Sequence, residues 1–207
     1  MSDRPLFALI LAAGESRRFG GDKLLAELNA KPVMVHVLAW VREALSRRLL
    51  AGGLAVIPAK NPARERLLLE SGLEYLFNAR PELGVAESLR LGLGALAGRH
   101  PEAMGALILQ GDQPRLRHDV LESLLKEWRN GSHPVVRPRY ADEPATPGHP
   151  VLLDRSIWPR VDELSGDAGF APLLLAYPEL VKTVDVPGTN PDINTPSDLA
   201  NLESSSR

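Results

Sequence analysis

The fold is decided by the stretch Leu6-Phe7-Ala8-Leu9-Ile10-Leu11-Ala12-Ala13-Gly14-Glu15-Ser16-Arg17-Arg18-Phe19-Gly20. Its first six residues form an uninterrupted apolar run that begins directly after Pro5. A short apolar run of this kind predicts a strand that is buried on both faces of a sheet. The polar, glycine-containing turn that follows then lies at the carboxyl end of a buried strand, which is where ligands bind in open α/β sheets.

Apolar runs alternate with segments of helical periodicity along the rest of the chain. Further strands are predicted over residues 54–57, 74–77, 104–109, 134–137, 151–153 and 181–186, and helices over residues 33–50, 62–70, 85–97, 118–128 and 168–176, with a last helix capped within residues 195–198. This alternation predicts an α/β fold of three layers (α/β/α), Rossmann-like, with a mostly parallel sheet. A single domain is expected over residues 1–207. Residues 137–150 are expected to form a surface loop or a lid, and residues 203–207 a frayed tail.

The composition excludes several classes of protein. The 207 residues are 44% hydrophobic and 24% charged with a formal net charge of -2, so the chain lacks the basic field of a nucleic-acid-binding protein. The absence of cysteine excludes disulfides, thiolate metal ligands and a cysteine nucleophile. The first apolar run is too short to span a membrane, and no signal peptidase site follows it. We therefore expect a cytoplasmic protein without a nucleic-acid or membrane partner.

The loop from Leu11 to Lys23 has the composition of a triphosphate-binding turn. Its small residues allow a backbone to approach a phosphate closely, and its glycines permit positive φ. Its small residues are Ala12, Ala13, Gly14, Gly20 and Gly21, and its cations are Arg17, Arg18 and Lys23. The loop is neither a Walker A motif nor a dinucleotide fingerprint, because Gly-Lys-Ser/Thr is absent and Ser16 replaces the second glycine. A solvated basic turn is the alternative interpretation.

Acidic and amide side chains follow at two later places. Asp112 comes directly after the predicted strand 104–109, in the turn Gln110-Gly111-Asp112-Gln113-Pro114, and is a candidate ligand of magnesium, which prefers one or two carboxylates together with phosphate oxygens. An ordinary turn aspartate is the alternative. Asp192 and Asn194 are separated by one residue, so an extended segment presents both on one face. These patterns predict a metal site near the triphosphate loop.

Two shorter motifs are candidates for ligand contacts. Gly84 precedes a predicted helix whose N-terminus suits an anionic or polar group, and Ser88 lies in its first turn. A Ser that faces solvent is the alternative there. His149, in Gly148-His149-Pro150, could contact an acidic substrate or assist proton movement, although a lone loop histidine often does neither. We expect the other histidines to have structural rather than functional roles.

In combination, these motifs resemble the MobA-like nucleotidyltransferase family, and within it the molybdenum cofactor cytidylyltransferases. The resemblance covers nearly the whole chain. Its motifs are Leu11-Ala12-Ala13-Gly14 with Ser16, Arg17, Gly20 and Lys23; Gly84 with Ser88-Leu89; Gln110 to Pro114; Gly148-His149-Pro150; Ser165-Gly166-Asp167 with Gly169; and Asp192 to Pro196 with Asp198-Leu199.

The resemblance implies a reaction in which an oxygen of the molybdopterin phosphate attacks the α-phosphorus of CTP and pyrophosphate leaves, with Mg²⁺ as cofactor. It implies a role for each motif. Leu11, Ala12, Ala13, Gly14, Gly84 and Ser88 would hold the nucleotide; Arg17 and Lys23 would bind the triphosphate and stabilise the transition state; Asp112 would hold Mg²⁺ together with Asn194 or Asp192; and Gln113, Gly148 and His149 would line the pterin side. The Ala12-Ala13 form resembles the cytidine branch, since the guanosine branch typically has two glycines there. A molybdenum hydroxylase or its maturation chaperone would be the protein partner.

Three alternative functions stay open at this point. The nearest is a transferase of the same fold with another base or acceptor, such as a guanylyltransferase. The second is a nicotinamide-dependent oxidoreductase on the same scaffold, although hydride transfer needs no magnesium and leaves Asp112 without a role. The third is a non-catalytic nucleotide-binding chaperone, for which Arg17 and Lys23 beside Asp112 would not be required.

Overall fold

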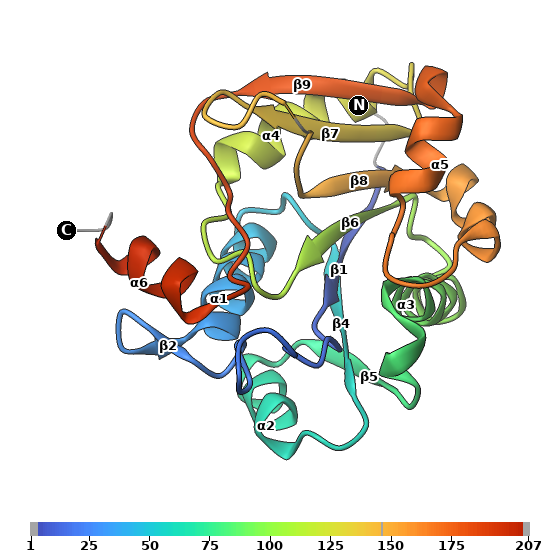
Figure 1. Cartoon of the computed structure of the whole chain (residues 1–207). Helices are drawn as coiled ribbons and strands as arrows, with labels where there is room; N and C mark the ends of the chain where they lie inside the picture. Colours follow the sequence, from blue (N-terminus) through green and yellow to red (C-terminus); the bar gives the residue numbers. More distant parts are fainter. Residues whose placement is uncertain (1–3, 146, 205–207) are drawn as a thin grey trace.

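A seven-stranded sheet in the order β5-β4-β1-β6-β8-β7-β9 forms the centre of the molecule (Figure 1). The computed structural model describes residues 4–145 and 147–204. The strands are β1 (Leu6–Leu11), β4 (Gly52–Pro58), β5 (Glu74–Asn78), β6 (Gly105–Gln110), β7 (Val135–Tyr140), β8 (Val151–Asp154) and β9 (Val181–Val186). All neighbouring strands pair in parallel except β8, which is antiparallel to β6 and β7. A separate hairpin joins β2 (Glu27–Leu28) to β3 (Lys31–Pro32).

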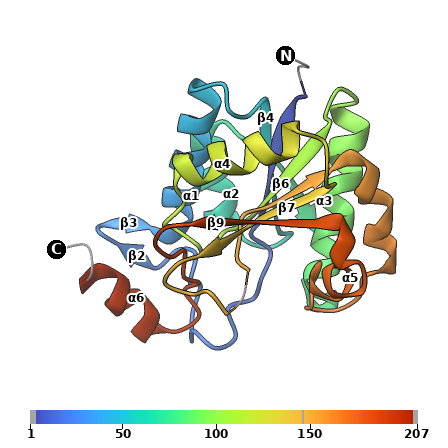
Figure 2. The same cartoon turned by 90° about the horizontal axis from the view of Figure 1, so that it is seen from above.

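Helices cover both faces of this sheet, as Figure 2 shows from above. The α-helices are α1 (Val33–Ser46), α2 (Pro62–Ser71), α3 (Val85–Arg99), α4 (His118–Arg129), α5 (Ala171–Ala176) and α6 (Pro196–Ser204), and the 3-10 helices are η1 (Pro81–Leu83), η2 (Arg155–Glu163) and η3 (Pro178–Leu180). Helices α1, α2 and α4 contribute to the core on one face, and α3, η2 and α5 to the core on the other. The predicted three-layer α/β fold with a mostly parallel sheet is confirmed.

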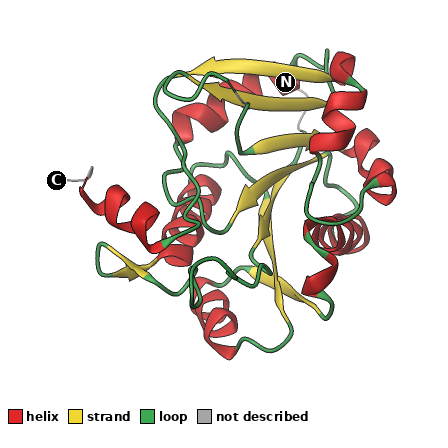
Figure 3. Cartoon of the chain, viewed as in Figure 1, coloured by secondary structure: helices red, strands yellow, loops and turns green. Residues whose placement is uncertain are grey.

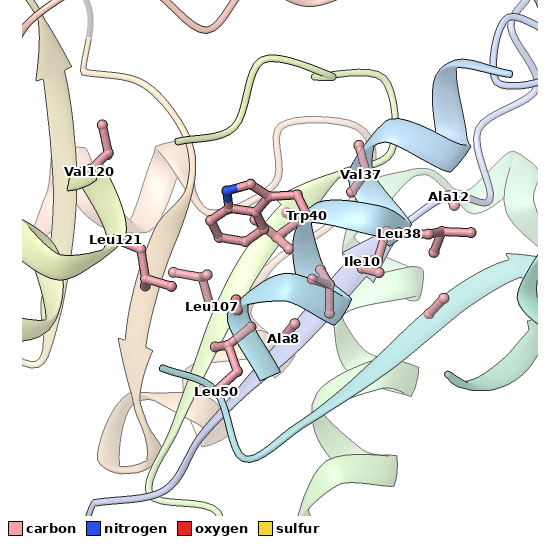
Figure 4. Packing of buried hydrophobic residues seen from close by; sticks show 14 of the residues in the cluster. Ala8, Ile10, Ala12, Val37, Leu38, Trp40, Leu50, Leu107, Val120 and Leu121 are labelled. Carbon is pink, nitrogen blue, oxygen red and sulfur yellow. The ribbon is translucent and has the colours of Figure 1, made fainter. Parts of the chain in front are cut away.

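Strand β1 is buried on both faces because its side chains alternate between the two cores. Leu6, Ala8 and Ile10 belong to the cluster under α1 and α4, whereas Phe7, Leu9 and Leu11 belong to the cluster under α3. Figure 4 shows the first of these clusters, with the Trp40 ring of α1 among the labelled aliphatic side chains. All six β1 residues are buried. Burial on both faces explains the uninterrupted apolar run, and it anchors the loop that follows.

The helix predicted over residues 33–50 ends earlier, at Ser46, and two other sequence-based boundaries are wrong next to a proline. The surface loop expected from residue 137 begins only after Tyr140, because β7 continues through Pro138 alongside β9. On its other side β7 pairs with β8 only at residues 135 and 136, so Pro138 lies beyond the ladder that its missing N–H would break. Helix α5 begins at Ala171, three residues later than predicted, which places Pro172 in its first turn.

Other expectations about the ends and the surface need only brief comment. Helix α6 extends to Ser204, and the last three residues of the predicted frayed tail lie outside the described residues. In the described part of the chain, no helix is both long enough and apolar enough to cross a membrane.

Candidate active site

The candidate site lies where the parallel strands β1 and β6 end side by side. The chain passes from β1 to β4 and β5 in one direction and then returns to place β6 on the other side of β1. This reversal of strand order opens a crevice between the loops after the two strands. A cavity of about 300 Å³ occupies it. Among its lining residues are ten predicted from the sequence: Leu11, Ala12, Ala13, Gly14, Arg17, Lys23, Gly84, Ser88, Asp112 and Asn194.

The loop after β1 presents free backbone amides to this cavity. No described residue accepts a hydrogen bond from the N–H groups of residues 13–18. Ser16 has a φ of 57°, which turns the backbone within this run. Successive unpartnered amides in such a turn form a concave site for an anion. The geometry of this part of the loop therefore suits the oxygen atoms of a phosphate.

The far end of the same loop brings a cation to the acidic side of the cavity. Lys23 Nζ donates to Asp112 Oδ2 at 2.5 Å and to Asn194 Oδ1 at 3.2 Å. Figure 3 shows how the loop from β9 to α6, which carries Asn194, passes the loops that follow β1 and β6. Its position is fixed by a backbone hydrogen bond of 3.1 Å from Ile193 N to Asp112 O. Residues 23, 112 and 194 are thus brought together by tertiary structure.

Two oxygen atoms on this side suit a divalent cation. Asp112 Oδ2 and Asn194 Oδ1 converge on one point, because a single ammonium bonds to both. A carboxylate and an amide oxygen are hard ligands of the kind that magnesium and manganese prefer. Among the described residues, no group of three or more His, Cys, Asp or Glu side chains is arranged to hold a metal ion by itself. A metal ion would therefore take its remaining ligands from phosphate oxygens and water.

Asp192, the other predicted metal ligand, lies beside the cavity rather than in its lining. Its Oδ1 accepts a hydrogen bond from Gln113 Nε2, and Gln113 Oε1 accepts one from Asn190 Nδ2 at 3.2 Å. Burial and the nearby charge of Asp112 raise the pKa of Asp192. Gln113 is buried and uses its amide within this network. Both residues support the segment that carries Asn194.

Gly84 and Ser88 line the opposite wall, at the start of α3. Gly84 has a φ of 87°, and a Cβ there would lie 2.4 Å from the backbone of Gly166. This close approach, with a hydrogen bond of 3.1 Å from Ala86 N to Gly166 O, holds the Ser165–Gly169 loop against the helix. Ser88 is buried, and its hydroxyl accepts a hydrogen bond from Asn78 Nδ2 at 3.1 Å. The alternative of a Ser that faces solvent is therefore wrong.

Arg17 and Arg18 lie at the mouth of the cavity. The Arg17 side chain is 76% exposed and pairs with Glu15 at 2.7 Å. Arg18 Nη2 donates to Asn194 Oδ1 at 3.2 Å. Both arginines are thus exposed, whereas the Lys23 side chain is only 16% exposed.

A second cavity of about 160 Å³ adjoins the first. Leu11, Val85, Gln110 and Asp167 line both, and the second also includes Arg137, His149 and Phe170. Burial and the nearby Arg137 lower the pKa of His149 to about 4, so the imidazole is neutral at pH 7.

Gly148 is in neither lining; its backbone N–H donates to Pro138 O at 2.8 Å and it packs on the Tyr140 ring. Of the predicted pterin-side residues, His149 alone therefore lines one of these two cavities.

The sequence interpretation missed Arg64, Asn61 and Asp22, which lie beneath the loop. Arg64 is buried, and its guanidinium contacts Asp22 and two carbonyl groups of the loop. Asn61 caps α2 by accepting a hydrogen bond from Arg64 N, and it also donates to Asp22 Oδ2 at 2.7 Å. A polar side chain at one helical position carries no local sign of such a partner. The position of Asp22 directly before the predicted cation Lys23 is a sequence feature that could have pointed to a role for Asp22 in this loop.

The sequence pattern of the MobA-like NTP transferase domain matches residues 8–182. A relative named "Probable molybdenum cofactor guanylyltransferase" from Pyrococcus horikoshii is 28% identical over 146 residues, which cover 70% of this chain and 67% of the relative. The match includes the β1 loop and the β6 turn, because both lie within residues 8–182.

Solved structures share the fold of this chain. The crystal structure of Rv0371c from Mycobacterium tuberculosis H37Rv superposes with a TM-score of 0.81 at 24% identity, over 98% of this chain and 100% of that one. A complex of the same protein with manganese superposes with a TM-score of 0.78 at 25% identity, over 97% and 99%. The predicted family and enzyme class are confirmed: the chain belongs to the MobA-like NTP transferase family and is a nucleotidyltransferase.

Proposed function

We propose that this protein transfers a cytidylyl group from CTP to the phosphate of molybdenum-bound molybdopterin and releases pyrophosphate, with Mg²⁺ as cofactor. The observation that carries the proposal is the run of unpartnered amides at residues 13–18 in one cavity with Lys23, Asp112 and Asn194. Together they offer anion donors and metal ligands on two sides of one space. That is what a triphosphate and its cation require.

Positioning and charge would account for the chemistry. An acceptor phosphate oxygen attacks the α-phosphorus of the nucleotide, the bond to the bridging oxygen of the β-phosphate breaks, and pyrophosphate leaves. The attacking oxygen is already anionic, so the site needs no strong general base. Lys23 and the loop amides would offset the repulsion between the two anions. When bound by Asp112 and Asn194, Mg²⁺ would supply Lewis-acid stabilisation of the phosphate charge.

The second cavity is the proposed place for the acceptor. Its apolar walls include Val85, Leu89, Val151, Phe170 and Leu174, which suit the faces of a fused heterocycle. The neutral His149 would accept or donate a hydrogen bond there without adding charge. Arg137, which is half-buried, supplies the cation that an anionic acceptor needs. This arrangement supports a molybdopterin-type acceptor, as the resemblance implied.

The preference for CTP rests on Ala13. The two-alanine loop resembles the cytidine branch of the family, and Ala13 is a buried residue that lines the first cavity. Guanylyl transfer is the second candidate, because the relative from Pyrococcus horikoshii carries a guanylyltransferase name. We further propose a cytoplasmic enzyme whose product passes to a molybdenum hydroxylase or its maturation chaperone.

Pyrophosphate release tests both choices. The enzyme is supplied with Mg²⁺ and with CTP, GTP or ATP in turn, with and without molybdenum-loaded molybdopterin. Release with CTP alone, and only with the pterin, is the expected result. Release with GTP would assign the protein to guanylyl transfer. Triphosphate binding without release in any combination would contradict the proposed acceptor and favour the chaperone or oxidoreductase alternatives.

A further inference from the structure

A single buried guanidinium lies directly beneath the nucleotide loop. The Arg64 side chain, from the first turn of α2, is 3% exposed. Nη1 donates to Ala12 O at 2.6 Å and to Gly14 O at 3.1 Å, and Nη2 also donates to Gly14 O at 3.1 Å. The loop residues on which the proposed function depends are therefore held from below by a residue about fifty positions away.

These bonds orient the amides that face the cavity. A trans peptide unit is planar, and its C=O and N–H groups point in opposite directions. Because Ala12 O and Gly14 O point to Arg64, the N–H groups of Ala13 and Glu15 point away from it. Both belong to the run of amides without a partner among the described residues. Arg64 therefore sets the direction of two of the proposed phosphate donors.

The same guanidinium also holds the other end of the loop. Nη2 donates to Asp22 Oδ1 at 2.7 Å and Nε to Asp22 Oδ2 at 2.9 Å. Asp22 Oδ1 in turn accepts a hydrogen bond of 3.1 Å from Leu24 N. Burial by itself raises the pKa of Asp22. The hydrogen bonds and charge of Arg64 and the hydrogen bond from Asn61 outweigh this effect, so the pKa is lowered overall and the carboxylate stays ionised. Lys23 lies between the two anchored residues, with its own N–H 3.3 Å from Ser16 Oγ.

We propose that Arg64 and Asp22 act as a positioning pair, which aligns the loop amides and Lys23 for the triphosphate without touching the reacting atoms. This inference rests on the proposed nucleotide site, though on neither the base nor the acceptor. Loss of the pair would remove the bonds that hold Ala12 O, Gly14 O and Asp22 on one guanidinium. Triphosphate affinity and turnover would then fall together, because both depend on the same aligned donors.

Arg64→Lys and Asp22→Asn test the pair, with Arg66→Lys as the matched control. Arg66 lies two residues away on α2, and its side chain is 74% exposed. Lysine keeps the charge but lacks the planar fork that reaches both ends of the loop. Each variant is compared with the parent protein in three measurements. Calorimetry gives the affinity of the protein for CTP and for GTP in the presence of Mg²⁺, steady-state kinetics give kcat and KM, and thermal unfolding gives Tm.

We expect kcat/KM to fall about a hundredfold in Arg64→Lys, the size of loss that follows a misplacement of about 1 Å in a catalytic group. Asp22→Asn should lose affinity and kcat in the same direction, whereas Arg66→Lys should match the parent. In an Arg64→Ala variant that is fully folded at the assay temperature, guanidinium at millimolar concentration should partly restore triphosphate binding. Because the variant is already folded, this restoration is not a gain in stability.

Parent-like triphosphate affinity and kcat in a folded Arg64→Lys variant would overturn the inference. If that variant does not fold, parent-like values in Asp22→Asn would overturn it instead. A parent protein that binds neither triphosphate would contradict the proposed nucleotide site itself. The two failures are therefore distinct.

Discussion

Lys23 Nζ donates to Asp112 Oδ2 at 2.5 Å, in a pair whose two side chains are each 16% exposed. The same ammonium reaches Asn194 Oδ1 at 3.2 Å. It therefore bonds to both oxygens that are the proposed ligands of Mg²⁺. A divalent cation and this ammonium compete for the same two atoms, and the arrival of a triphosphate would give Lys23 a second set of oxygens to bind.

This competition predicts how Lys23→Met changes metal binding. Without nucleotide, the variant should bind Mn²⁺ about tenfold more tightly than the parent, because the competing charge-assisted bond is gone. Its affinity for the triphosphate and its kcat should both fall. Titration of free Mn²⁺ by electron paramagnetic resonance measures the first effect, with Lys31→Met, at an exposed position, as control. Unchanged Mn²⁺ affinity would show that Lys23 does not compete for this site.

Asp112→Asn should remove transfer activity and leave the fold intact. The amide still accepts the hydrogen bond from Lys23, but it carries no charge to hold the metal. We expect kcat to fall by about a thousandfold, the size of effect that follows loss of one electrostatic group in an active site. Pyrophosphate release and circular dichroism measure the two properties, with Asp142→Asn, at an exposed position, as control. Full turnover by the folded variant would exclude Asp112 from the mechanism.

Gly84→Ala should destabilise the protein and raise KM for the nucleotide. A methyl group at this position would lie 2.4 Å from the Gly166 backbone, and its φ of 87° is strained for alanine. We expect a loss of about 1–3 kcal/mol in the free energy of unfolding. Gly94→Ala is the matched control within α3, because a Cβ there would meet no atom within 4 Å; it should gain about 0.5–1 kcal/mol. Chemical denaturation distinguishes the two, and equal effects would contradict the close contact.

His149 should make stability depend on pH in the mildly acidic range. Its pKa falls from 6.5 to about 4 in the folded protein, so between these values the unfolded chain binds the extra proton. The contribution of His149 to the free energy of unfolding is therefore complete above pH 6.5 and is lost as the pH falls toward 4. This contribution is on the order of 3 kcal/mol at most.

The measurement compares unfolding free energies at pH 7 and pH 5 for the parent and His149→Gln. The parent should lose more stability than the variant. An equal loss in both would show that the imidazole is not held in its neutral form.

Local pattern was sufficient for the elements that flank the site. The apolar run of β1, the small residues of its loop and the carboxylate after β6 are each contiguous in sequence, and each predicted its own position at the carboxyl end of a strand. Helical periodicity similarly located α1 and α4. Where a proline interrupted the pattern, at Pro138 and Pro172, the boundaries were wrong, because only the neighbouring strand or helical turn decides whether the missing N–H matters.

The sequence by itself thus determined the fold class, the family and which two turns would meet. The tertiary structure alone decided how side chains from separate elements pair: Lys23 with Asp112 and Asn194, Gln113 with Asp192, and Arg64 with both ends of the nucleotide loop. Such pairs depend on the rotation of α2 and the path of the loop from β9 to α6. Those are set when the two apolar cores pack against opposite faces of the sheet, and no local stretch of sequence records that packing.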